Sequence, residues 1–189
     1  MEKLEYKRIH IPRPDRHSLI KTCGSLPYNA SIELGGYLTT TSILYTEGTR
    51  ENVPVMGSHE TVFHTHPNRD RADIPSELDV LNLMMLNWKT SIILTPHQLI
   101  VMSKTPETES RLNDMERIHD RHVLDVATLL RRKGPDSVFY YLVKKMIRTQ
   151  AHRFRLSHRN WEHTWEAFVR DGLQMDLKTW ACIPISCAA

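Results

Sequence analysis

Two histidines separated by one residue stand at the end of an apolar run, in the stretch FHTHP of Phe63–Pro67. On a β-strand, residues i and i+2 point to the same face, so His64 and His66 can reach one point while Thr65 points away. Two neutral imidazoles that face one point suit a zinc ion. Because the chain has 11 histidines, a pair with this spacing also arises by chance, so the pair alone does not establish a metal site.

A serine and an aspartate follow after a polar loop, in the stretch PSELD. At the start of a helix, Ser76 and Asp79 lie on the same face of the first turn. The same spacing is that of a capping box, and the two roles can coexist. Together with His64 and His66, Asp79 completes a candidate set of three metal ligands. Such a set leaves the fourth tetrahedral position open for water, as in catalytic zinc sites.

A general base is required beside such a water, and Glu33 in the stretch IELGGYL is the candidate. It stands at the start of a predicted strand that could lie beside the strand of the histidines. Glu47, Glu51 and Glu60 lie nearer to the histidines in the sequence and are the alternatives.

Taken together, these motifs resemble the signature of the JAMM (MPN+) zinc metalloproteases: Glu33 with Gly36 and Leu38, His64-Thr65-His66-Pro67, and Ser76-x-x-Asp79. The resemblance implies one zinc ion per chain, held by His64, His66 and Asp79. It implies that Glu33 is the general base and that Ser76 donates a hydrogen bond to the oxyanion. Nine residues separate the second histidine from the serine, which is more than is usual for the family, and the separation of Glu33 from His64 is short for it.

The resemblance covers residues 15–105 and implies an α/β fold with a mixed β-sheet flanked by helices, in a cytidine-deaminase-like arrangement. The implied reaction is hydrolysis of an amide or isopeptide bond after the C-terminus of ubiquitin or a ubiquitin-like protein. By themselves, the residues indicate metal-assisted amide hydrolysis. Two alternatives stay open: a catalytically silent scaffold of the same fold, and a hydrolase acting on a small amide or on a phage or virus assembly protein.

The elements that must position these motifs follow from the residue pattern. β-Branched and alternating residues predict two short strands between Ser31 and Thr46, a strand ending at His66, and strands at 90–96 and 98–104. An N-terminal extended arm over 1–14 and a helix from Asp15 to Leu26 precede them. A helix opens at Ser76, with one predicted apolar face: Leu78, Leu81, Met85 and Trp88.

After Pro106 the pattern becomes helical, with predicted helices at about 107–133, 135–157 and 158–173. We therefore predict a catalytic domain over 1–106 and an all-helical C-terminal extension over 107–189. The segment 144–159 carries six Lys and Arg residues without an acid, which fits either a solvated basic face or a contact for nucleic acid or an acidic partner. Trp161, Trp165 and Phe168 fit either a core or a docking face for a protein partner.

Composition bears on the partners and the cellular location that can be expected. The net charge of +3 is too small to predict nucleic acid as a partner, and no apolar run approaches the ~20 residues of a membrane span. An odd, sparse set of three cysteines indicates reduced thiols and a cytoplasmic location.

Overall fold

The computed structural model describes residues 5–10, 26–53, 59–67, 73–121, 138–155 and 160–181. The chain divides into two compact units that alternate along the sequence. The first unit comprises Met1–Pro75, Trp88–Met102 and Lys178–Ala189, and the second comprises Ser76–Asn87 and Ser103–Leu177. The assignment of residues 1–106 and 107–189 to two domains stays a prediction.

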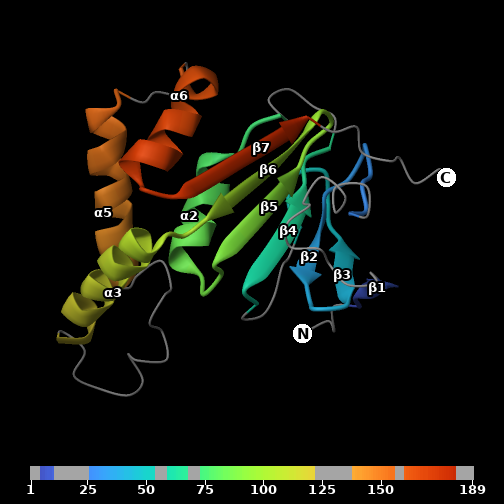
Figure 1. Ribbon diagram of the computed structural model, residues 1–189, viewed down its shortest axis with the longest axis horizontal. Coiled ribbons are helices and arrows are strands. Elements are labelled where there is room, and N and C mark those ends of the chain that lie inside the picture. The colour runs from blue at the N-terminus through green and yellow to red at the C-terminus, as the bar shows by residue number, and fades with distance from the viewer. Residues whose placement is uncertain are drawn as a thin grey trace. The chain divides into compact units, whose positions relative to one another are not determined.

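A seven-stranded mixed β-sheet has the strand order β1-β3-β2-β4-β5-β6-β7 (Figure 1). Its strands are β1 (Lys7–His10), β2 (Leu34–Leu38), β3 (Ser42–Glu47), β4 (Thr61–Thr65), β5 (Thr90–Leu94), β6 (Gln98–Ser103) and β7 (Asp176–Ala181). The pairs β1–β3, β2–β3 and β2–β4 are antiparallel, and β4–β5 is parallel. Parallel neighbours need a long crossover connection, and the chain between β4 and β5 contains the helix Glu77–Met85.

The predicted strands around the histidine motif are confirmed as β2 to β6, and β4 carries His64. Within the first unit, a buried cluster supports them: Leu26, Tyr28, Ile43, Phe63, Ile92, Leu94, Leu99 and Val101. Phe63 is fully buried one residue before His64, so the core fixes the orientation of β4. This packing determines which face of β4 carries the histidines.

Strand β7 differs from the all-helical extension that the sequence predicts. Six residues, Asp176–Ala181, form it beside β6, and Trp180 packs against the buried cluster of the first unit. Threonine and tryptophan favour strands. A segment this short has no periodicity that would separate it from a loop in the sequence alone.

The second unit contains α2 (Glu77–Met85), α3 (Pro106–Arg121), α5 (Val138–Arg153), α6 (Trp161–Ala167) and the π-helical turn η1 (Phe168–Gly172). Helix α5 contacts α2, α3 and η1. Three aromatic side chains from the end of the unit, Trp161, Trp165 and Phe168, are buried. The rings of Trp161 and Phe168 pack edge to face, so the core interpretation holds for these residues.

The predicted apolar face of α2 is wrong at its first position. Leu78 is 60% exposed, and the buried residues of the helix are Val80, Leu83, Met84 and Met85. Positions 80, 83 and 84 follow the i, i+3, i+4 spacing of one helical face. The helix is therefore rotated relative to the prediction, and Leu78 lies at the surface.

Several predicted features lie outside the described residues. They are most of the helix from Asp15, the chain between α3 and α5, and all three cysteines. Among the described helices, none is long and apolar enough to cross a membrane.

Gly36 tests how tightly β2 and β3 pair. A Cβ atom at this position would lie 1.8 Å from the carbonyl oxygen of Leu44. Gly36→Ala must push β3 away, so we expect the free energy of unfolding to fall by about 1–3 kcal/mol. Urea unfolding followed by circular dichroism measures this change. Thr41→Ala, at an exposed position between β2 and β3, is the control and should stay within about 0.5 kcal/mol of the parent. Equal stability of the two variants would contradict the close approach.

Candidate metal centre

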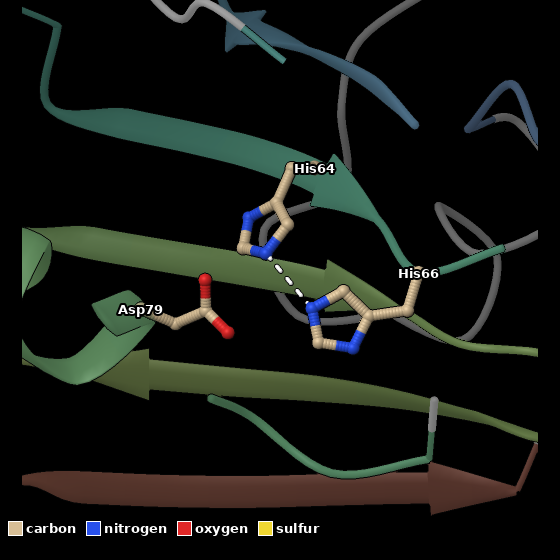
Figure 2. A group of neighbouring side chains, drawn as sticks. All are labelled: His64, His66 and Asp79. Atoms are coloured by element: carbon tan, nitrogen blue, oxygen red, sulfur yellow. Dashed lines mark hydrogen bonds between the residues drawn. The ribbon is translucent and has the colours of Figure 1, made fainter. Parts of the chain in front are cut away.

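The side chains of His64, on β4, and of His66, one residue past the end of β4, approach each other. Their Nε2 atoms are 3.2 Å apart, and the ring planes are tilted by 52°. Figure 2 shows both rings directed to one point from the end of the strand. Thr65 between them is fully buried and points away, as the strand geometry predicts.

Three hydrogen bonds hold this end of β4 in place. The Leu34 N–H donates to Thr65 Oγ1 at 2.8 Å, and the His66 N–H donates to the Leu94 carbonyl at 2.8 Å. The buried Tyr28 hydroxyl donates to the His66 carbonyl at 3.2 Å. Buried backbone groups must be paired, so displacement of the histidines would leave polar groups unsatisfied. The fold thus fixes the backbone that carries the two histidines.

Asp79 occupies the first turn of α2, and the capping box expected there is present. Asp79 N–H donates to Ser76 Oγ at 3.2 Å, and Ser76 N–H donates to Asp79 Oδ2 at 2.6 Å. A carboxylate has two oxygens and about four acceptor positions, so capping leaves room for a metal ion. The positive end of the helix dipole favours the ionised carboxylate that a metal requires.

These three side chains form a group that could hold a metal ion. Potential ligand atoms of His64, His66 and Asp79 all lie within 4.8 Å of one another, and the carboxylate points toward the two rings (Figure 2). A tetrahedral zinc ion with Zn–N distances of about 2.0–2.1 Å would separate two nitrogens by about 3.3–3.4 Å. The observed separation of 3.2 Å between the two Nε2 atoms fits a shared ion.

Glu33 directly precedes β2, and β2 pairs with the histidine strand β4, as predicted. The antiparallel register between β2 and β4 pairs Gly35 with His64. Only 5% of Glu33 is exposed, and its N–H donates to the Thr49 carbonyl at 2.7 Å. It is not a member of the three-residue ligand group, and its role as a base stays a prediction.

The nine-residue loop Pro67–Pro75 is anchored at its far end, which the sequence did not reveal. Thr95 Oγ1 donates to Asp73 Oδ1 at 3.0 Å, and His97 Nε2 lies 3.8 Å from Asp73 Oδ2. The Gln98 side-chain amide donates to the Asp73 carbonyl. These contacts of Asp73 fix the end of the loop to the turn between β5 and β6. The other charged residues of the loop lie outside the described residues: Arg69, Asp70 and Arg71.

Comparisons with known proteins add no relative. No protein-family model, no curated protein and no solved structure matches the chain. The resemblance to JAMM metalloproteases therefore depends on the motif residues. The capacity of His64, His66 and Asp79 to hold a metal depends on their positions.

Metal titration tests the group directly. We expect one zinc ion to bind per chain after chelator treatment, as measured by isothermal titration calorimetry. His64→Ala or Asp79→Ala should weaken binding by more than the ~10–100-fold that is typical of changes to residues that only hydrogen-bond to a metal ligand, because each removes a ligand itself. Binding should also weaken as the pH is lowered, since imidazoles coordinate only when unprotonated. His97→Ala, at an exposed histidine outside the group, is the matched control. Unchanged affinity in both ligand variants would exclude this site.

Tyr28 tests the fixation of the strand end. Burial, with a smaller contribution from the Asp73 carboxylate, raises the pKa of Tyr28. Tyr28→Phe should lower the free energy of unfolding by about 1 kcal/mol at pH 8, because the His66 carbonyl loses its donor. A raised pKa in the folded state means that this stabilisation is complete below pH ~10 and is lost as the pH rises through the folded-state pKa. Urea unfolding of both proteins with EDTA at pH 8 and pH 11 measures the difference, and a difference independent of pH would contradict the role of the protonated phenol.

Proposed function

We propose that this chain is a zinc-dependent metalloprotease of the JAMM type that hydrolyses an amide or isopeptide bond after the C-terminus of ubiquitin or a ubiquitin-like protein. The observation that carries the proposal is the group of His64, His66 and Asp79, whose ligand atoms lie within 4.8 Å of one another. Three protein ligands leave a coordination position for water or substrate.

The donor set restricts the choice of metal but does not identify it. Two histidines and one carboxylate hold zinc in hydrolases and iron in some oxygenases. The choice of zinc comes from the motif resemblance. When bound, zinc supplies a Lewis acid and a water acidic enough to act as a nucleophile near neutral pH.

Glu33 is proposed to move the proton. Its carboxylate takes a proton from the attacking water and delivers it to the leaving amine. Two features support this role: Glu33 directly precedes β2, the strand that pairs with β4, and it is buried. Burial keeps bulk water from competing for the proton, and Gly35 opposite His64 has no side chain to fill the space beside the ring.

Ser76 is proposed to stabilise the oxyanion of the tetrahedral intermediate. Its hydroxyl oxygen accepts a hydrogen bond from the Asp79 N–H, which uses a lone pair. The hydroxyl hydrogen stays able to donate to a developing negative charge. Ser76 thereby serves the helix and the reaction through different atoms of one group.

The proposal of a ubiquitin-like substrate depends on the motif resemblance. The proposal of a cytoplasmic location depends on the small, odd number of cysteines. Zinc-loaded protein should be assayed with ubiquitin carrying a C-terminal fluorogenic amide, with isopeptide-linked di-ubiquitin, and with several ubiquitin-like conjugates. Cleavage of a small amide alone would replace the substrate class but keep the hydrolase. Zinc binding without cleavage of any substrate would favour a scaffold.

Glu33→Gln separates the base from the ligands. We expect the variant to lose at least about 100-fold in kcat, because general-base catalysis contributes that much or more. It should retain one zinc ion per chain, since Glu33 is not a ligand. Glu51→Gln, at an exposed glutamate, is the matched control and should keep full activity. A Glu33→Gln protein that lost its zinc would show that Glu33 coordinates the metal, and one with unchanged kcat would remove it from catalysis.

A further inference from the structure

A basic groove runs along helix α5 in the second unit. Its volume is about 460 Å³, within the range of ligand sites. Side chains on one face of the helix line it: Tyr141, Lys144, Lys145, Arg148, Thr149 and His152. Their spacing of three and four residues places them in a continuous row. Helix α5 is the orange helix of Figure 1.

The charge of this row is not balanced within the helix. No Asp or Glu occurs between Val138 and Arg155. In the part of the chain that the structure describes, the ion pairs found involve neither Lys145 nor Arg148. Both side chains are exposed, so an anionic ligand can reach them. Lys144 Nζ lies over the Tyr140 ring, 5.4 Å from its centroid.

An aromatic ring stands at one end of the row of cations. Tyr141 is 62% exposed, although a ring of this size is usually more buried. Cations that follow a phosphate backbone, combined with exposed rings on which bases stack, are the means by which proteins bind single-stranded nucleic acid. An acidic peptide would account for the charges but not for the exposed ring, and lysine is depleted at protein interfaces.

We propose that the α5 groove binds single-stranded nucleic acid, with phosphates on Lys144, Lys145 and Arg148 and a base stacked on Tyr141. From Tyr141 to His152 the helix rises about 16 Å, which is enough for a few nucleotides. The net charge of +3 does not predict such a partner, because it averages the local row over the whole chain. This site is independent of the metal centre and of the proposed hydrolysis.

Fluorescence anisotropy with the full-length chain tests the proposal, with fluorescein-labelled 12-nucleotide oligothymidylate and oligouridylate as probes. Three phosphate contacts predict that log K falls with log [salt] with a slope of about −2. Lys145→Ala/Arg148→Ala should reduce this slope by about 1.4 and weaken binding at least about tenfold at low salt. The control Arg8→Ala/Arg170→Ala removes the same charge from two exposed positions outside the groove and should bind within about twofold of the parent. Equal weakening by both pairs would overturn the site.

Tyr141 separates stacking from general attraction of anions. Tyr141→Ala should weaken binding by about fivefold or more without changing the salt slope, and Tyr141→Phe should bind like the parent. Because Tyr141 is exposed, circular dichroism of both variants should match the parent. An oligoglutamate peptide or a 12-base-pair duplex that binds as tightly as the single strand would overturn the proposal in favour of an acidic protein segment or of a duplex. Loss of Tyr141 without effect on oligonucleotide affinity would also overturn it.

Discussion

The pairing of β2 with β4 helps to position the candidate metal ligands His64 and His66. The Leu34 N–H bonds to the Thr65 side chain rather than to a ladder carbonyl, at the point where β4 ends. Thr65 is fully buried, and this hydrogen bond satisfies both its hydroxyl oxygen and the Leu34 N–H. The pairs of β4 with β2 and with β5 fix its register, and a slip of one residue would turn both histidines to the other face. Register is therefore the constraint on which the candidate metal centre depends.

A second constraint is that Ser76 and Asp79 each have two roles, because they cap helix α2 and also lie at the candidate metal centre. Asp79 and Ser76 satisfy each other's backbone N–H groups at the start of α2. Each also keeps atoms with which it can take part in coordination or catalysis. The helix start is thus ordered before a metal binds, and binding does not have to supply the free energy of forming it. Preorganised ligands of this kind raise metal affinity because little conformational entropy is lost on binding.

Local sequence patterns were sufficient to predict the features that depend on neighbouring residues. The spacing of His64 and His66 predicted their common face, and the spacing of Ser76 and Asp79 predicted the capping box. Features that depend on distant partners were not predictable. Asp73 binds the turn between β5 and β6, and Tyr28 binds the His66 carbonyl, but neither residue carries a pattern that names its partner. The buried face of α2 was misjudged for the same reason, since tertiary contacts rather than periodicity decide which apolar residues are covered.

Strand β7 has a consequence for the synthesis of the chain on the ribosome. It lies beside β6 in the sheet, yet Asp176 follows Ser103 by 73 residues. At about 5–20 residues per second, a nascent chain would expose the open edge of β6 for about 4–15 s before β7 emerges. An unpaired strand edge is a template for pairing with other chains. Translation speed through the intervening helices therefore sets how long this edge is open to aggregation or to protection by a chaperone.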